Sequence, residues 1–217
     1  LTPKEIIAFS SQIGASKIAL ELGYEEMKKN YYDFGFTKPI SINFPSSAFG
    51  YMNIKESVID KDLASLGYGY GITISPFQIA SAYSVFANKG IFKDFKLLKN
   101  QKVTSRQIIS PITAKHVLDA LDMVVNDGTG TAANIKGFSE GGKTGTVHQT
   151  RRGSGYADDL YRASFVGITP LSSKSLTIFI SIDDPSLNAY SGGAVAAPVF
   201  TKIAESSLNY LGYFQDE

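Results

Sequence analysis

The amino-acid sequence predicts an α+β fold in which helices flank an antiparallel sheet. Proline follows a hydroxyl residue at three places, which is typical of helix starts. Three apolar segments of strand length, residues 142–147, 163–169 and 175–182, come late in the chain. Only residues 170–174 separate the last two segments, and so short a connection favours an antiparallel hairpin.

The three helix starts share their chemistry. Thr2-Pro3, Ser75-Pro76 and Ser110-Pro111 each place a hydroxyl at the N-cap and proline at the first helical position. Glu5 and Gln78 follow the first two caps by three residues and complete predicted capping boxes. The apolar residues behind the second and third caps have helical spacing: Ile79, Tyr83 and Phe86, then Val117, Leu121 and Val124.

The other helices and loops are predicted from the polar and glycine-rich interruptions between them. A helix over residues 13–22 follows the polar interruption Ser10-Ser11-Gln12 and ends at Gly23. Residues 36–73 are expected to be mostly irregular, with a turn at Gly67-Tyr68-Gly69-Tyr70-Gly71, and Asn126-Asp127-Gly128-Thr129-Gly130 marks a loop. A last helix runs from Ala197-Pro198 to Gly212, and these apolar residues are expected to pack on the sheet: Phe200, Ile203, Ala204, Leu211.

Composition excludes several classes of function. The 217 residues carry a formal net charge of +1, so nothing indicates a nucleic-acid partner. The absence of cysteine excludes disulfides, a thiolate nucleophile and a cysteine zinc site, and His116 and His148 are too isolated to predict a metal. No apolar stretch reaches the length of a membrane span, and the first residues show neither Met nor a signal peptide. We therefore expect Leu1 to mark a cut inside a longer protein.

The segment Gly141-Gly142-Lys143-Thr144-Gly145-Thr146 is the strongest candidate for chemistry. On a regular strand Lys143 faces away from Thr144 and Thr146. The two hydroxyls would bind a carboxylate, Lys143 would add positive potential from behind, and Gly145 would let another molecule approach the backbone. A plain surface strand with small polar residues is the alternative.

Lys-Thr-Gly is one of three motifs of serine penicillin-binding proteins and related β-lactamases. Ser10-Ser11-Gln12 resembles the second, Ser-x-Asn, with Gln in place of Asn. The segments 69–80 and 10–20 resemble class B penicillin-binding proteins of the septal type, as does Asp184-Pro185 followed by Gly192-Gly193-Ala194-Val195-Ala196-Ala197-Pro198-Val199-Phe200. Because these segments keep the family order over most of the chain, the chain is identified as similar to that family.

The resemblance implies a penicillin-binding protein or serine β-lactamase-like fold that is incomplete in this chain. No serine is followed three residues later by lysine, so the nucleophile motif Ser-x-x-Lys is expected upstream of Leu1. Residues 1–217 would then be the C-terminal portion of one transpeptidase domain. A pedestal domain and a membrane span would precede it, holding the enzyme at the extracytoplasmic face of the bacterial inner membrane.

The family's roles carry over to matching positions only. Ser10 is expected to relay a proton, and Gln12 to hydrogen-bond the substrate amide with a side chain one methylene longer than Asn. Lys143 would supply positive potential near Ser10, and Thr144 and Thr146 would receive the substrate carboxylate. The backbone N–H of Thr146 would form half of an oxyanion hole.

The implied reaction is peptidoglycan D,D-transpeptidation through an acyl-serine, with covalent binding of β-lactams and no cofactor. A glycan polymerase and division proteins are the implied partners, and the isolated chain is expected to be inactive. A D,D-carboxypeptidase or β-lactamase, a penicillin-sensing receptor domain and a purely structural fragment are the alternatives.

Residues 149–159 are expected to form a mobile solvated loop, or else a lip of the active site.

Overall fold

The computed structural model describes residues 1–39, 48, 50–52, 59–151, 155–172, 174–186 and 188–213. The chain divides into two compact units. Unit 1 contains Leu1–Ile6 and Ser10–His116, and unit 2 contains Ile7–Phe9 and Val117–Glu217.

The first helices of unit 1 begin and break where the sequence predicts. Helix α1 spans Pro3–Ala8, and its capping box is formed: Thr2 N–H donates to Glu5 Oε2 over 2.7 Å and Glu5 N–H donates to Thr2 Oγ1 over 3.3 Å. Helix α2 spans Gln12–Asp33 and kinks at Gly23, whose φ of +76° favours glycine. The predicted end of a helix at Gly23 is therefore confirmed as a break between two helical segments.

The prediction that residues 36–73 are mostly irregular is wrong for the part that the structure describes. Helix α3 spans Asp60–Gly67, and strands β1 (Tyr51–Met52) and β2 (Ile72–Thr73) pair antiparallel. Leu63 and Leu66 are buried, so tertiary packing stabilises a helix of only 8 residues that has no side-chain cap. Residues 40–47, 49 and 53–58 lie outside the described residues. The predicted turn after α3 is confirmed, with Gly69 and Gly71 at positive φ.

Gln78 joins helix α4 (Pro76–Ala87) to the segment that follows α2. The predicted capping box is present, since Gln78 N–H donates to Ser75 Oγ and Ser75 N–H donates to Gln78 Oε1. The side-chain amide of Gln78 then donates to three backbone carbonyls, those of Gly35, Phe36 and Lys38, over 2.9–3.2 Å. Its Oε1 also accepts from Gly50 N–H over 2.8 Å, so this buried amide is fully satisfied.

A hairpin that the sequence analysis did not identify lies between α4 and α5. Strand β3 (Ile91–Lys93) pairs antiparallel with β4 (Ser105–Gln107). Helix α5 spans Pro111–Asn126, as predicted, and Thr113 N–H donates to the predicted N-cap Ser110 over 3.0 Å. The loop predicted at residues 126–130 follows it and leads into the short 3-10 helix η1 (Thr131–Ala133).

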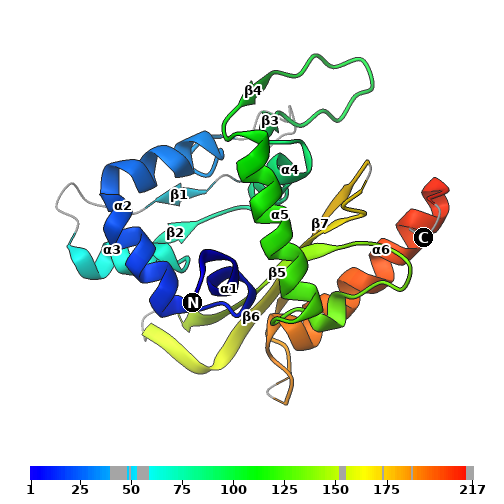
Figure 1. Ribbon diagram of the computed structural model, residues 1–217. Coiled ribbons are helices and arrows are strands. Elements are labelled where there is room, and N and C mark those ends of the chain that lie inside the picture. Colours follow the sequence, from blue (N-terminus) through cyan, green and yellow to red (C-terminus); the bar gives the residue numbers. More distant parts are fainter. Residues whose placement is uncertain are drawn as a thin grey trace. The chain divides into compact units, whose positions relative to one another are not determined.

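Unit 2 is built on a three-stranded antiparallel sheet of order β5-β6-β7 (Figure 1). The strands span Gly141–Arg151, Gly155–Thr169 and Leu176–Asp183. They confirm the three predicted segments; the first two are longer than predicted and the third is shifted by one residue. The expected loop over residues 149–159 is wrong for its described part, because Thr150 pairs with Tyr156 and Arg151 with Gly155; residues 152–154 lie outside the described residues. The backbone ladder of a long hairpin continues here regardless of side-chain polarity, after an irregularity between His148 and Thr150.

The core of unit 2 lies between this sheet and helix α6. The π-helical turn η2 (Gly192–Ala196) leads into α6 (Ala197–Leu211), which ends at Gly212 with φ +72°, as predicted. Phe200 and Ala204 are fully buried as expected, but Ile203 and Leu211 are 43% and 51% exposed. Leu208 is buried instead, because it continues the stripe of residues 197, 200 and 204 along one helical face. Over the described residues, no helix combines the length and apolar character needed to cross a membrane.

Gln78→Ala is predicted to destabilise the chain by roughly 3 kcal/mol, because it leaves several buried backbone groups without partners. Urea denaturation followed by circular dichroism measures the change. Gln107→Ala is the control, since Gln107 also donates to two carbonyls but is exposed. If the two variants lose the same free energy of unfolding, burial of the Gln78 amide does not add to its contribution to stability.

Candidate active site

The register of β5 places Lys143 and the two threonines on opposite faces of the sheet. Thr144 pairs with Phe165 and Lys143 pairs with Val166, and cross-strand partners share a face. Phe165 is fully buried and its ring lies 5.0 Å from that of Phe200. Thr144 and Thr146 therefore lie on the face that carries η2 and α6, and Lys143 on the other. The predicted alternation is confirmed.

Thr146 is oriented by the turn η2. Gly192 N–H donates to Thr146 Oγ1 over 3.0 Å, which leaves the hydroxyl hydrogen available to donate elsewhere. A Cβ on Gly192 would stand 2.2 Å from the Ser164 carbonyl oxygen and 2.6 Å from that of Gly145. Glycine is therefore required for the turn to approach β5 this closely.

Thr144 is tied to a loop that the sequence analysis gave no role. Thr144 Oγ1 lies 2.7 Å from Thr129 Oγ1, and either hydroxyl can donate. Thr129 N–H donates to the carbonyl of Ala8 over 3.3 Å, and Ala8 precedes Ser10 by two residues along the chain. A Cβ on Gly128 would lie 2.3 Å from the same carbonyl oxygen. In the sequence, the only indication of this contact was a hydroxyl residue, Thr129, inside a glycine-rich loop.

Lys143 is held in a partly buried position. Its ammonium donates to the Thr144 carbonyl over 3.1 Å. Burial lowers the pKa of Lys143 to about 8, because desolvation disfavours the charged form. Most Lys143 side chains therefore carry a positive charge at pH 7 and lose it as the pH rises through 8.

Ser10, Ser11 and Gln12 form the break between α1 and α2, as predicted. Ser10 has a φ of +54°, a conformation that is strained for a residue with a side chain and that often marks functional sites. Ser11 caps α2 by accepting from Gly14 N–H over 3.1 Å, and Gln12 is exposed in the first turn. These three residues belong to unit 1 and residues 143–146 to unit 2, so their joint action stays a prediction.

A buried carboxyl group lies at the start of β5. Glu140 is 3% exposed; its Oε1 accepts from Asn134 Nδ2 over 3.0 Å and from Ile135 N–H over 3.2 Å. Its Oε2 is buried and finds no hydrogen-bond partner among the described residues. Burial raises the pKa of Glu140 to about 7, the Ile135 hydrogen bond opposes this, and Asp122 adds to it.

An aromatic column continues the threonine face of β5. His148 lies 4.5 Å from the ring of Tyr161, and Tyr161 stacks on Tyr190 at 4.2 Å. Tyr190 is 41% exposed, so it offers apolar surface next to the strand that carries Thr146. The strand alternation that places Thr144 and Thr146 on one face also places His148 there. The sequence therefore contained this information, and the sequence analysis did not use it. Among the described residues, no group of three His, Cys, Asp or Glu side chains is arranged to hold a metal.

The sheet, the Lys-Thr-Gly-Thr strand and the serine at positive φ between two helices fit the transpeptidase class that the sequence resembles. A family model described as "Penicillin binding protein transpeptidase domain" matches residues 1–205. The chain belongs to this family, and its relatives place it with the class B penicillin-binding proteins.

Among curated proteins, the chain is 37% identical over 213 residues to the probable peptidoglycan D,D-transpeptidase PbpC of Pseudomonas aeruginosa, covering 97% of this chain. It is 33% identical over 200 residues to the peptidoglycan D,D-transpeptidase FtsI of Buchnera aphidicola, covering 91% of this chain. The chain spans only 38% and 35% of the lengths of these two relatives.

Solved structures agree with the fold. The transpeptidase domain of Burkholderia pseudomallei penicillin-binding protein 3 superposes with a TM-score of 0.91 at 34% identity, covering all of this chain and 66% of that one. Penicillin-binding protein 3 of Mycobacterium tuberculosis, complexed with aztreonam, gives a TM-score of 0.86 at 25% identity, covering 100% of this chain and 53% of that one. These likenesses confirm the predicted fold class of helices with an antiparallel sheet.

The chain is predicted to be more stable at pH 5 than at pH 8 through Glu140. Its folded-state pKa lies above the ordinary value of 4.5, so its contribution is fully present below pH 4.5 and is lost as the pH rises through about 7. The loss amounts to roughly 3 kcal/mol at 1.36 kcal/mol per pKa unit. Glu140→Gln, which stays neutral, should remove this pH dependence in urea denaturation at several pH values. An unchanged profile would mean that Glu140 does not titrate between pH 5 and 8.

Proposed function

We propose that this chain supplies the substrate-carboxylate and proton-relay residues of a serine D,D-transpeptidase that cross-links peptidoglycan stem peptides during division. One observation carries the proposal: β5 separates the Lys143 ammonium from the hydroxyls of Thr144 and Thr146, and Gly192 orients the second hydroxyl as a donor. Such an arrangement suits a peptide that ends in a carboxylate, as the D-Ala-D-Ala end of a stem peptide does.

The serine that is acylated would come from the longer protein, because none of the 217 residues forms a Ser-x-x-Lys motif. Its oxygen attacks the carbonyl between the two D-alanines after a base takes its proton. The C–N bond breaks, and the terminal D-alanine leaves with a proton on its new amine. An amine of a neighbouring stem then attacks the acyl-serine, forms the cross-link and returns the serine hydroxyl.

The residues of β5 would act on the substrate carboxylate and the developing oxyanion. Thr144 and Thr146 donate their hydroxyls to the carboxylate, and the charge of Lys143 strengthens that attraction in a partly buried setting. In the described sheet β5 is an edge strand, which leaves backbone groups along its outer edge for an extended substrate. The N–H of Thr146 would donate to the oxyanion together with an N–H at the acylated serine.

Ser10 and Gln12 would complete the site from the break between α1 and α2. Ser10 would pass a proton to the leaving amine and take one from the attacking amine. The strained backbone at Ser10 supports this role, because such strain persists only where surrounding structure enforces it. Gln12 would accept or donate hydrogen bonds at the substrate amide. β-Lactams would acylate the same serine, since they present an amide carbonyl and a carboxylate.

The longer protein would act at the extracytoplasmic face of the inner membrane, where stem peptides are cross-linked. A glycan polymerase and other division proteins would be its partners, because cross-linking must keep pace with synthesis of the glycan strand. The match to transpeptidases such as FtsI and PbpC supports this assignment over a carboxypeptidase or a receptor domain.

Fluorescent penicillin is predicted to label the longer protein covalently but not the 217-residue chain alone. Lys143→Ala in the longer protein should slow acylation by roughly a hundredfold or more, which is typical for loss of an electrostatic contact to the transition state. The wild-type rate should fall above about pH 8, where Lys143 loses its charge. Stopped-flow fluorescence measures the rates.

Lys136→Ala is the matched control, because Lys136 is an exposed lysine of the same unit. Acylation that persists unchanged in Lys143→Ala would remove Lys143 from the site. An acyl adduct on the isolated chain, detected by mass spectrometry, would show that the chain contains its own nucleophile. Deacylation of the adduct by water in seconds would favour a β-lactamase instead.

Thr129→Val in the longer protein is predicted to slow acylation by roughly three- to tenfold, the equivalent of one neutral hydrogen bond. Valine keeps the shape of threonine but removes the hydroxyl that bonds Thr144. Thr129→Ser keeps that hydroxyl and should restore the wild-type rate. If the Thr129→Val variant is acylated as fast as the Thr129→Ser variant, Thr129 does not position Thr144.

A further inference from the structure

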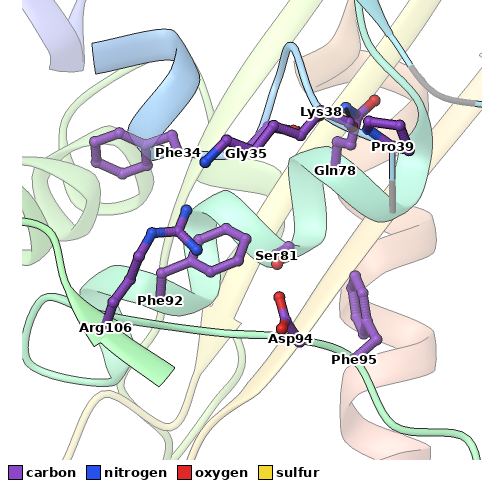
Figure 2. Close-up of a pocket in the computed structure, with 10 residues that line it drawn as sticks. All are labelled: Phe34, Gly35, Lys38, Pro39, Gln78, Ser81, Phe92, Asp94, Phe95 and Arg106. Carbon is purple, nitrogen blue, oxygen red and sulfur yellow. Dashed lines mark hydrogen bonds between the residues drawn. The ribbon is translucent and has the colours of Figure 1, made fainter. Parts of the chain in front are cut away.

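A cavity of about 70 Å³ lies within unit 1, and none of the residues assigned to the transpeptidase site lines it (Figure 2). Three charged side chains face it, Lys38, Asp94 and Arg106. Three aromatic rings give it apolar walls: Phe34, Phe92, Phe95. Such a mixture of opposite charges and rings in one small volume is unlike an ordinary packing defect, which is apolar.

The two cations are held in place by aromatic rings and backbone. The Arg106 guanidinium lies 4.2 Å from the centroid of Phe92 and donates to the Asp33 carbonyl. The Lys38 ammonium lies 3.3 Å from the centroid of Tyr32. Gln78 in turn fixes the backbone of Lys38 through its carbonyl. Both cations are therefore positioned before any ligand arrives.

The charges of this cavity lack counter-ions within the described part of the chain. Neither Lys38 nor Arg106 forms an ion pair with a described carboxylate, and the hydrogen bond to Asp94 comes from the neutral hydroxyl of Thr104. All three side chains are partly buried. Partly buried charges without partners are costly, so a ligand that pairs with them gains more than it would at an open surface.

Figure 2 shows how the charges divide the cavity. The ammonium of Lys38 and the guanidinium of Arg106 lie on the side of Phe34, and the Asp94 carboxylate points toward Ser81. Ser81 is 6% exposed and adds a hydroxyl that can donate or accept. One end of the cavity is therefore cationic and the other anionic.

We propose that this cavity binds a small zwitterionic α-amino acid. The carboxylate of the ligand pairs with Lys38 and Arg106, its ammonium pairs with Asp94 beside Ser81, and a short side chain contacts Phe95. A water needs about 10–15 Å³ of such a volume, so the cavity admits a molecule of a few heavy atoms, the size of glycine or alanine. Free alanine is the amino acid that transpeptidation would release, and this link alone rests on the proposed function.

Titration of the ¹⁵N-labelled 217-residue chain by NMR tests the proposal without any catalytic step. Glycine, D-alanine and L-alanine are compared with acetate and methylamine, each of which offers one of the two charges, at constant ionic strength. Saturable shifts at Ser81, Phe95 and Arg106 are expected, with a dissociation constant on the order of 1 mM for an amino acid. Acetate and methylamine should bind at least tenfold more weakly.

Asp94→Asn and Arg106→Gln should each weaken amino-acid binding at least tenfold, and Asp62→Asn, an exposed acid of α3, should not. Asparagine can still accept from Thr104, so the hairpin is expected to stay folded. Acetate binding as tight as alanine would reduce the site to a simple anion site and overturn the proposal. Chemical-shift changes confined to other residues would also overturn the proposal. So would a titration that does not saturate at an amino-acid concentration 50-fold above the expected dissociation constant.

The wild-type ligand series decides the question even if a variant does not fold. Penicillin acylation of the longer protein should be unchanged in Asp94→Asn, so a failure of this proposal and a failure of the transpeptidase proposal are distinguishable.

Discussion

The close approach of the turn η2 to strand β5 is the constraint on which unit 2 depends. Gly192 stands against the backbone at Gly145 and Ser164, where a Cβ would lie within 2.6 Å of two carbonyl oxygens. The same approach brings Gly192 N–H to Thr146 Oγ1 and starts α6 at the position where Phe200 meets Phe165. One steric requirement therefore sets both the hydrophobic core and the direction of a hydroxyl proposed to bind substrate.

In unit 1 a polar side chain, and not a glycine, fixes the positions of neighbouring segments. Gln78 is buried, and its amide joins the cap of α4 to the carbonyls that follow α2. A buried amide with all of its partners costs little, but it fixes geometry because any shift leaves a polar group unsatisfied. The position of Lys38, and with it one end of the charged cavity, follows from this network.

Local chemistry was predictable from the sequence, and long-range packing was not. The caps at Thr2, Ser75 and Ser110 and the glycine at the end of α6 depend on neighbours within four residues, and the structure has them all. Helix α3 lacks a side-chain cap and is stabilised by burial of Leu63 and Leu66, which no local pattern reveals. The hydrogen bond between Thr129 and Thr144 joins residues 15 apart and could not be read from either motif. The alternation of Lys143 with its threonines was predictable because the period of a strand is local.

Burial disfavours the charged form of two ionisable groups, Glu140 immediately before β5 and Lys143 within it. It raises the pKa of Glu140 to about 7 and lowers the pKa of Lys143 to about 8, because in both cases the charged form is disfavoured. Below pH 7 Glu140 is mostly neutral and Lys143 carries a positive charge. As the pH rises through about 7 and then about 8, Glu140 gains a negative charge and Lys143 loses its positive charge, so this segment attracts a carboxylate less. The proposed site is therefore expected to attract a carboxylate most strongly below about pH 7, where Glu140 is neutral and Lys143 is charged.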